Sequence, residues 1–293
     1  MLLPYLSLTL AALIWGANTP IMKWALESTP LFSLAFLRFS IATLLILPFT
    51  TKKLRIEKED WPKIILAALF GITFNVVFFF LGVKFTFASN AALIIAAIPI
   101  FTIFAAQIFL KEKVKGKLIA AAVLSIIGFA LIFGPSVAAF GLNHLFGGIF
   151  LILASLFWVG YEIVSKKLFK KYSPQTVTLY SFLIGAFTFL PFFIVELLTS
   201  SWTSELKFQG VVGIIYGAIF SSTVAYFAWQ WGLSKLKASE ASFFFYLDPV
   251  SGVIVSIILL GERVSSLFVL GAVLITASLF LAEYHRKNHP IHR

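Results

Sequence analysis

The chain has 293 residues, of which 60% are hydrophobic and only 12% are charged, and its mean hydropathy is +0.99. Because soluble domains carry about 25% charged residues, this composition excludes a soluble globular protein and predicts an integral membrane protein. The net charge of +11 does not indicate nucleic-acid binding, because the Lys and Arg residues lie at the ends of apolar runs. The lack of cysteine excludes disulfides, thiolate metal sites and cysteine nucleophiles.

Ten apolar runs of membrane-spanning length follow one another along the chain, each near the roughly 20 residues that a spanning helix needs. The first half holds runs from about Pro4 to Leu26, Leu31 to Phe49, Ile64 to Val83, Ser89 to Leu110 and Leu118 to Phe133. The second half holds runs from about Phe146 to Leu168, Val177 to Leu198, Val211 to Leu233, Ala241 to Leu260 and Ser266 to Tyr284. We therefore expect an all-α integral membrane protein with ten transmembrane helices.

The two halves of the chain share one plan. A shift of 150 residues places identical residues on each other, and the identities are Gly82 and Gly232, Ala88 and Ala238, Ser89 and Ser239, Ala91 and Ala241, Pro99 and Pro249, Glu112 and Glu262, and Val114 and Val264. Nearer the start of each half the shift is 143, which aligns Trp15 with Trp158 and Lys23 with Lys166. Internal repeats determine architecture, so we expect a first five-helix repeat over residues 1–135, a second over 146–284, and a basic cytoplasmic tail over 285–293.

The distribution of basic residues predicts the orientation, because Lys and Arg are retained on the cytoplasmic side. With a cytoplasmic N-terminus, 18 of the 23 Lys and Arg residues fall in the cytoplasmic connections and the tail. Four, namely Lys23, Lys84, Lys207 and Arg263, fall on the outer side, and Arg38 lies within a helix. Both termini are then cytoplasmic, in the inner (cytoplasmic) membrane of the cell. Five helices per repeat is an odd number, so the second repeat enters from the other side and the repeats are inverted.

Inverted repeats favour a carrier, because two similar halves that face opposite sides can exchange one packing for the other around a central site. No HExxH, GxSxG or Walker motif occurs, and all four histidines lie outside the expected helical core. We therefore expect no enzyme activity, no metal and no cofactor. Without a nucleotide site, active transport must use an ion gradient, such as protons, or exchange.

Several segments together carry a resemblance to a known family. They are the opening ALIWGANTPIMKWAL, the segment PLFSLAFLR and the repeated A-S-x-A, proline and glutamate of residues 88–112 and 238–262. Over about Leu6 to Glu283, the sequence resembles the EamA-type members of the drug/metabolite transporter superfamily. The resemblance implies a ten-helix bundle with a central cavity and transport, often export, of amino acids or other small metabolites. Lys111 stands where the family commonly has glycine, and we expect it to stiffen that helix end.

Three ionisable residues inside the apolar runs are the first candidates for the site, since such residues are costly in a bilayer. Asp248, near half depth, is suited to bind a substrate ammonium or a proton, or else to cap a kink or pair with an arginine. Arg38 either pairs with Asp248, locks helices together or snorkels outward. Glu162 either pairs with Lys166, one turn away, or faces the cavity beside Tyr161 and Trp158.

Uncharged residues complete the candidate site. The expected polar and aromatic lining consists of Trp15, Asn18, Asn75, Tyr161, Ser222, Trp229 and Tyr246, although such residues also serve only to join helices. The prolines Pro20, Pro99 and Pro249 are expected to kink their helices. Glu112 and Glu262, at opposite ends of equivalent helices, are expected to be interfacial caps or gates rather than substrate ligands.

The sequence therefore predicts a secondary transporter that exports amino acids or other small metabolites by alternating access. The expected partners are a small-molecule substrate, the lipid bilayer and a coupling proton, with no nucleic acid and with the oligomeric state left open. Two alternatives remain at this point. A flippase for a lipid-linked intermediate predicts a lateral opening and a basic patch, and a membrane sensor or structural subunit predicts midplane polar residues that are all paired.

Overall fold

The computed structural model describes residues 2–50, 54–112 and 142–284, and residues 124, 127, 128, 130 and 131 between them. Within these residues, eight helical stretches are long and apolar enough to span a membrane. They are Leu2–Ala25, Leu31–Phe49, Lys58–Phe85, Ala88–Leu110, Leu142–Leu168, Pro174–Thr199, Phe208–Lys235 and Ala238–Leu260. A further helix, α14 (Ser266–Tyr284), packs its Phe268 against Leu93 and Ala96. The predicted helix of residues 118–133 falls largely outside the described residues, so the count of ten stays a prediction.

Two of the spans contain a π-helical segment at equivalent places in the two halves. The third span consists of η2 (Lys58–Asp60), α3 (Trp61–Ala68), the π-helix η3 (Leu69–Phe74) and α4 (Asn75–Phe85). Its equivalent in the second half consists of α10 (Phe208–Ile215), the π-helix η4 (Tyr216–Val224) and α11 (Ala225–Lys235). Such π segments are rare, and they occur frequently at functional sites.

Proline interrupts a second pair of equivalent spans. Ahead of Pro99 the helix is broken between α5 (Ala88–Ile95) and α6 (Ile98–Leu110). Ahead of Pro249, the short α12 (Ala238–Ala241) and the 3-10 helix η5 (Ser242–Leu247) precede α13 (Asp248–Leu260). Proline lacks an N–H group and disfavours helical conformation in the residue before it, which explains both breaks. Pro20, in contrast, lies within the uninterrupted α1 (Leu2–Ala25).

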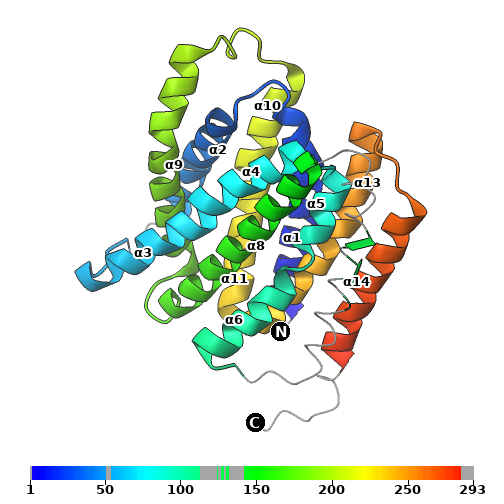
Figure 1. Ribbon diagram of the computed structural model, residues 1–293. Helices are drawn as coiled ribbons and strands as arrows, with labels where there is room; N and C mark the ends of the chain where they lie inside the picture. The colour runs from blue at the N-terminus through cyan, green and yellow to red at the C-terminus, as the bar shows by residue number, and fades with distance from the viewer. Residues whose placement is uncertain are drawn as a thin grey trace.

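The helices of the two halves pack against each other in matching pairs (Figure 1). Helix α1 packs on α11 and α13, and α8 (Leu142–Leu168), its equivalent, packs on α4 and α6. Helix α2 (Leu31–Ile46), which continues into η1 (Leu47–Phe49), packs along its own equivalent, α9 (Pro174–Thr199). The bundle is therefore built from contacts between the halves, which leaves its centre between them.

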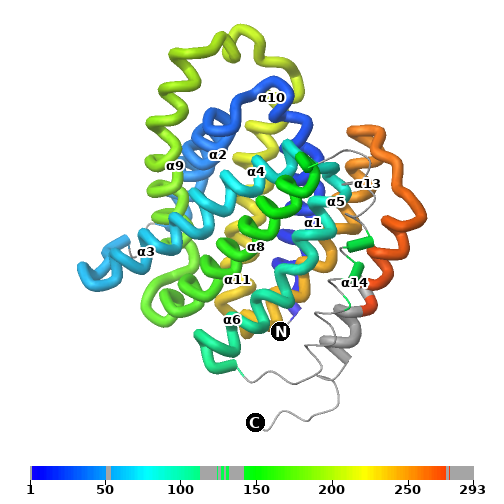
Figure 2. Tube along the Cα trace, viewed as in Figure 1, coloured from blue at the N-terminus to red at the C-terminus, as the bar shows by residue number. Residues whose placement is uncertain are grey.

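The bundle has two ends, which the chain trace distinguishes (Figure 2). We call the end that holds the start of α1 the N-terminal face; it also holds the start of α3, the end of α6 and the α8–α9 connection. The opposite face holds the α1–α2, α4–α5, α9–α10 and α13–α14 connections. The position of a residue along its helix therefore tells which of the two faces it is nearer.

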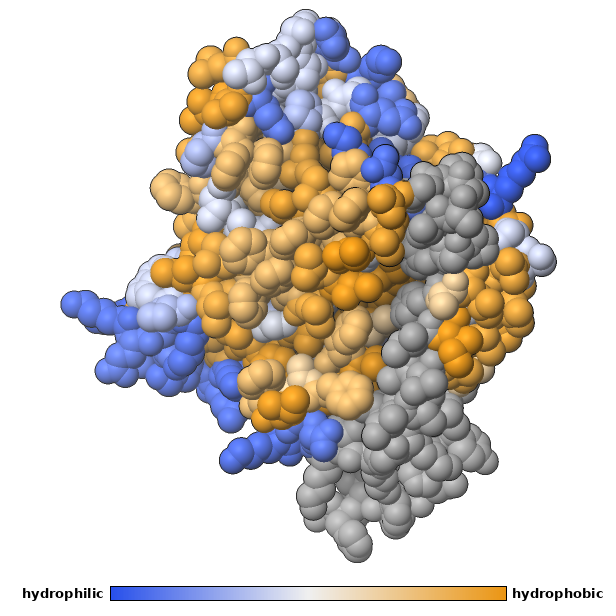
Figure 3. Space-filling view, in the orientation of Figure 1, coloured by the Kyte–Doolittle hydropathy of each residue, from blue (hydrophilic) through white to orange (hydrophobic). Residues whose placement is uncertain are grey.

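An apolar belt covers the side of the bundle seen in Figure 3, between the two faces. Large apolar side chains are highly exposed on the spanning helices, among them Phe187 at 73%, Leu198 at 79% and Ile258 at 78%. In water such a surface would aggregate, whereas in a bilayer it contacts lipid chains at no cost. Hydrophilic residues gather at the ends, as expected of a membrane-spanning protein.

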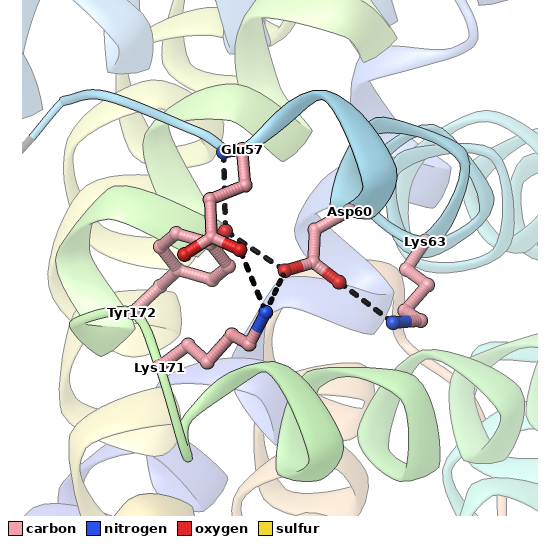
Figure 4. A network of polar contacts seen from close by, with 5 residues as sticks. All are labelled: Glu57, Asp60, Lys63, Lys171 and Tyr172. Carbon is pink, nitrogen blue, oxygen red and sulfur yellow. Dashed lines mark hydrogen bonds and ion pairs between the residues drawn. The ribbon is translucent and has the colours of Figure 1, made fainter.

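A polar network ties the start of the third span to the α8–α9 connection on the N-terminal face (Figure 4). Lys171 Nζ donates to Glu57 Oε2 at 2.8 Å and to Asp60 Oδ2 at 2.9 Å, and the same Asp60 oxygen accepts from the Tyr172 hydroxyl at 2.9 Å. The other oxygen of Asp60 accepts from Lys63 at 2.6 Å. These hydrogen bonds to Glu57 and Asp60 raise the pKa of Lys171 above its ordinary range.

Candidate functional site

A cavity of about 70 Å³ lies near the middle of the bundle, and both halves of the chain contribute to its wall. Its polar lining residues are Asn18, Thr19, Arg38, Asn75, Ser155 and Asp248. The rest of the wall is apolar or aromatic. Pockets for drug-sized ligands measure about 300–1,000 Å³, so in this conformation the cavity has room for only a few waters or a very small solute.

Asp248 is the acidic residue of the cavity, and its side chain is buried with 1% exposure. Pro249 ends the regular helix upstream, which makes Asp248 the first residue of α13. Its Oδ1 has no hydrogen-bond partner within the part of the chain that the structure describes. A buried carboxylate oxygen without a partner carries a large desolvation cost, so this group is a candidate to receive a cationic ligand.

Arg38 is the basic residue of the same cavity, and it is held by serine hydroxyls rather than by an acid. Its Nε donates to Ser222 Oγ at 2.6 Å, and its Nη2 donates to Ser221 Oγ at 2.9 Å. The ion pair with Asp248 that the sequence allowed is not present among the described residues. The reason is local, because the π-helix η4 presents both serines to the guanidinium. The positive charge therefore has neutral partners only.

The uncharged polar residues of the cavity differ in whether their side chains already have hydrogen-bond partners. Asn75 Nδ2 donates to the carbonyl of Ala154 at 2.9 Å, and Ser155 Oγ donates to the carbonyl of Leu151 at 2.9 Å. These two side chains are committed to the wall. In contrast, Asn18 Oδ1 and Thr19 Oγ1 are buried without a partner among the described residues. Unpartnered buried polar atoms are uncommon in proteins, so these atoms are candidates to contact a ligand or water.

Five aromatic side chains close the cavity toward the N-terminal face, and we call them the aromatic layer: Trp15, Trp158, Tyr226, Trp229 and Phe245. Ring centroids are 4.9 Å apart between Trp15 and Trp158, and 4.2 Å between Trp229 and Phe245. Trp15 precedes Asn18 on α1, and Phe245 precedes Asp248 along the chain. Because both segments start at the N-terminal face, the layer lies nearer that face than Asn18 and Asp248. The layer is anchored, because Trp15 Nε1 donates to the carbonyl of Ser221 at 2.9 Å.

Glu162 lies beyond the aromatic layer, one turn past Trp158 on α8, and it is fully buried. Its Oε1 accepts from Trp229 Nε1 at 3.0 Å, and its Oε2 bonds to Thr102 Oγ1 at 2.9 Å. The predicted pair with Lys166 does not form. Lys166 instead donates to the carbonyls of Leu233 and Leu236, because the end of α11 lies next to it. Glu162 is therefore not part of the cavity wall in this conformation.

Of the other predicted site residues, some lie at the cavity and some lie away from it. Trp15, Asn18 and Asn75 line the cavity, Ser222 supports Arg38, and Trp229 belongs to the aromatic layer. Tyr161 is buried against Gly71 of η3, where an added Cβ would lie 2.3 Å from the ring. Tyr246 packs beside the Leu93, Ala96 and Phe268 cluster, away from the cavity.

Other residues at or near the cavity escaped the sequence prediction: Thr19, Thr102, Ser155, Ser221, Tyr226 and Phe245. Thr19 and Ser221 each adjoin a predicted residue, so their neighbours were a usable signal. Phe245 likewise adjoins the predicted Tyr246, whereas Tyr226 had no such neighbour and is a common residue type in a chain with 34 Phe and eight Tyr.

Each face of the bundle carries a contact between the two halves that we call a latch. In the N-terminal-face latch, Glu112 accepts from the backbone N–H groups of Ala238 and Ser239 at 3.1 and 3.3 Å, and from Ser239 Oγ at 2.5 Å. Lys166 binds the Leu236 carbonyl beside it. Glu112 is therefore an interfacial cap for the start of the ninth predicted helix.

The opposite-face latch is built from the equivalent residues. Glu262 accepts from the backbone N–H groups of Ala88 and Ser89 at 2.8 and 2.9 Å. Lys23 donates to the Thr86 carbonyl and lies 3.9 Å from Glu262. Because the end of each broken span caps the start of the other, α5–α6 and α12–α13 run antiparallel. Each span ends in a left-handed residue, Lys111 with φ 58° and Gly261 with φ 64°.

The fold and the cavity together define a polytopic membrane protein with a polar central site between two similar halves. Sequence comparison agrees with this class. The chain matches the EamA-like transporter family over residues 2–134 and 145–284. It is 27% identical over 290 residues to an uncharacterized transporter of Archaeoglobus fulgidus, with coverage of 96% of this chain and 98% of the relative.

Further relatives are similar over most of their length. The uncharacterized transporter YyaM of Bacillus subtilis is 30% identical over 288 residues, with coverage of 95% of this chain and 93% of the relative. A solved crystal structure, 17% identical, aligns with a TM-score of 0.72 over 98% of this chain and 99% of that chain, which shows the fold alone. The chain belongs to the EamA-like transporter family. It is therefore a membrane transporter and not an enzyme.

Proposed function

We propose that this transporter carries small zwitterionic metabolites, such as amino acids. The observation that carries the proposal is the presence of Asp248 and Arg38 in one cavity, neither of them paired with an opposite charge within the described residues. A carboxylate is suited to a substrate ammonium and a guanidinium to a substrate carboxylate. A single buried arginine gives less support to a polyphosphate or lipid-phosphate substrate.

The mechanism we propose is alternating access between two inverted five-helix repeats, with the N-terminal face cytoplasmic. The antiparallel course of α5–α6 and α12–α13 supports inversion, and the equivalent latches support a device that can close at either end. Sites held between inverted repeats lie near the midplane, as this cavity does along its helices. We propose export as the direction, in line with the family resemblance.

The energy source we propose is an ion gradient or exchange. The sequence holds no Walker or other nucleotide-binding loop, so transport against a gradient needs a second solute. The cavity wall contains one acid and one base, which bind a zwitterion without net charge transfer. Coupling therefore needs a further titratable group outside the cavity wall.

The test starts from a thermal-shift screen of purified protein against amino acids, their amine analogues without the carboxylate and their hydroxy-acid analogues without the ammonium. Hits are then assayed by counterflow in proteoliposomes. We expect zwitterions to stabilise the protein and to cross the membrane, and both analogue classes to bind more weakly by about tenfold to a hundredfold, as loss of a charged hydrogen bond implies. Equal binding and flux of the zwitterions and of either analogue class would contradict the proposal.

Two variants assign the charged groups. Asp248→Asn is expected to weaken binding of ligands with an ammonium and to leave hydroxy acids unaffected. Arg38→Gln is expected to weaken ligands with a carboxylate and to leave amines unaffected. Asn75→Ala serves as a control for the wall, because its amide is already bonded to the Ala154 carbonyl. The same loss for every ligand class in both charge variants would indicate a structural role instead.

A further inference from the structure

Glu162 is a buried carboxyl group that the substrate cavity does not use. Its side chain has no exposure to solvent and makes two hydrogen bonds, to Trp229 Nε1 at 3.0 Å and to Thr102 Oγ1 at 2.9 Å. Both partners are neutral. Burying a charge with neutral partners alone is very costly, whereas a protonated acid has no such cost.

The hydrogen-bond geometry fits a carboxylic acid. The Thr102 hydroxyl donates to Glu162 Oε2, and it can rotate to accept the O–H of a protonated Glu162, since a hydroxyl can accept as well as donate. The other oxygen of Glu162 then accepts from the Trp229 indole N–H, which can only donate. The heavy-atom distances of both contacts therefore accommodate one proton on the carboxyl group with the same two partners.

No cation compensates Glu162 in the described part of the chain. Lys166, one turn away on α8, is bonded to the carbonyls of Leu233 and Leu236. Helix α6 contributes Thr102 and has no titratable residue. The titratable groups on the elements around it include Tyr161 on α8, Tyr226 on α11, which donates to the Gly71 carbonyl, and Lys63 on α3, which is bonded to Asp60. Lys167 on α8 lies over the Phe109 ring, and Glu240 on α12 interacts with Lys166.

The position of Glu162 connects it to the aromatic layer. Trp229 is a member of that layer and also the donor to Glu162. On α8, Trp158 of the layer lies between Ser155 in the cavity wall and Glu162. Glu162 and Asp248 are therefore on opposite sides of the layer, and a change in the charge of Glu162 acts first on Trp229.

We propose that Glu162, Thr102 and Trp229 form a proton-binding site, distinct from the substrate cavity, that controls opening of the aromatic layer toward the N-terminal face. In the closed conformation described here, Glu162 carries the proton. When the layer opens, the O–H bond of Glu162 breaks, the proton passes to water from the N-terminal face, and the electron pair stays on the carboxylate. The inference rests on the proposed function, because a coupling proton has meaning only in a carrier.

Infrared spectroscopy tests whether Glu162 is protonated, and it needs no substrate. Wild-type protein in lipid nanodiscs is expected to show the carbonyl stretch of a protonated carboxylic acid at neutral pH, with a small shift in D₂O. Glu162→Gln should remove that component, because glutamine reproduces both hydrogen bonds but has no acid group. Trp229→Phe should shift the component to higher frequency, because the carbonyl loses its donor.

Two control variants complete the spectroscopic test. Glu196 accepts from the N–H groups of Phe32 and Ser33 at the start of α2, away from Glu162, and Glu196→Gln should leave the component assigned to Glu162 unchanged. Asp248→Asn should leave the part assigned to Glu162 in place. An acid component that survives Glu162→Gln and does not move in Trp229→Phe would overturn the proposal.

Transport assays separate this inference from the proposed function. Counterflow in wild-type proteoliposomes needs only a carrier, and its failure for every zwitterion would refute the proposed function without bearing on the spectra. With counterflow established, Glu162→Gln should lose the stimulation of transport by a pH gradient that wild type shows. Retained stimulation in Glu162→Gln would refute the coupling role while leaving the carrier intact.

Discussion

The two latches of the bundle are built from equivalent residues, but they are not equally strong. Glu112 accepts three hydrogen bonds on the N-terminal face, and Glu262 accepts two on the opposite face. Lys166 binds two carbonyls, whereas Lys23 binds one. One repeated sequence plan therefore closes both ends, and small substitutions make one closure tighter. We expect the opposite face to open more readily.

One difference acts against this trend. The span before Glu262 ends at Gly261, and the span before Glu112 ends at Lys111, although both residues have left-handed backbone conformation. Glycine adopts that conformation without strain, and lysine does not. The expected stiffening by Lys111 is not tested by the structure, which shows only that Lys111 takes the conformation its glycine equivalent takes. The N-terminal-face latch is thus tight but partly strained.

The largest expected effect is the loss of a latch glutamate. Glu112→Ala leaves two backbone N–H groups and a hydroxyl without their acceptor and should cost about 2–3 kcal/mol of stability. Glu262→Ala removes two bonds and should cost about 1–2 kcal/mol. Apparent Tm values of both variants in one detergent give the comparison. Equal losses, or a larger loss for Glu262→Ala, would show that the bond count does not rank the latches.

The next effect concerns the latch lysines. Lys166→Met keeps the length of the side chain but frees the carbonyls of Leu233 and Leu236, and we expect a cost of about 1–2 kcal/mol. Lys23→Met frees the Thr86 carbonyl and should cost about 1 kcal/mol. The same thermal assay measures both. If Lys23→Met were the more damaging variant, the 3.9 Å approach of Lys23 to Glu262 would outweigh the second carbonyl of Lys166.

Substitution of the two residues with left-handed backbone, Lys111 and Gly261, should change the stability of the protein in opposite directions. Lys111→Gly should stabilise the protein by about 1 kcal/mol, because it relieves backbone strain, and Gly261→Ala should destabilise it by about 1 kcal/mol for the converse reason. Lys111→Ala is the matched control for loss of the lysine side chain without relief of strain. Stabilisation by Lys111→Ala equal to that by Lys111→Gly would point to the charge and not to the backbone.

The smallest effect is expected at the exposed network around Lys171. Its hydrogen bonds to Glu57 and Asp60 raise the pKa of Lys171, so the contribution of the charged lysine to stability is present below the ordinary lysine pKa of about 10.4 and is lost only as pH rises through the raised value. Lys171→Ala should therefore lower the apparent Tm slightly, by the same amount at neutral and mildly alkaline pH, and less in high salt. A marked change between neutral and mildly alkaline pH would contradict this assignment.

Periodicity and repetition were sufficient to predict much of the fold. Nine of the predicted spans correspond to described helices, for example Ser266–Tyr284, and the alignment of Glu112 with Glu262 correctly indicated equivalent roles at two ends. The chemistry of a bilayer explains this success, because every spanning backbone must be helical and apolar. The tenth span, around residues 118–133, stays a prediction.

The partners of individual polar groups could not be predicted from the sequence. Depth along a helix allowed Arg38 to reach Asp248, but the π-helix η4 turns Ser221 and Ser222 toward it instead. Spacing placed Lys166 on the same face as Glu162, but the end of α11 offers Lys166 two carbonyls. In both cases a neighbouring helix, remote in sequence, determines the contact.

The most direct test of alternating access is the distance across each latch, measured by electron spin resonance in nanodiscs. The chain has no native cysteine, so spin labels can be placed at the exposed Phe109 and Lys235 on the N-terminal face, and at the exposed Lys84 and Arg263 on the opposite face. We expect Glu112→Ala to add a longer distance to the first pair only, and Glu262→Ala to add one to the second pair only. Lengthening of both pairs by the same single variant would contradict alternating access.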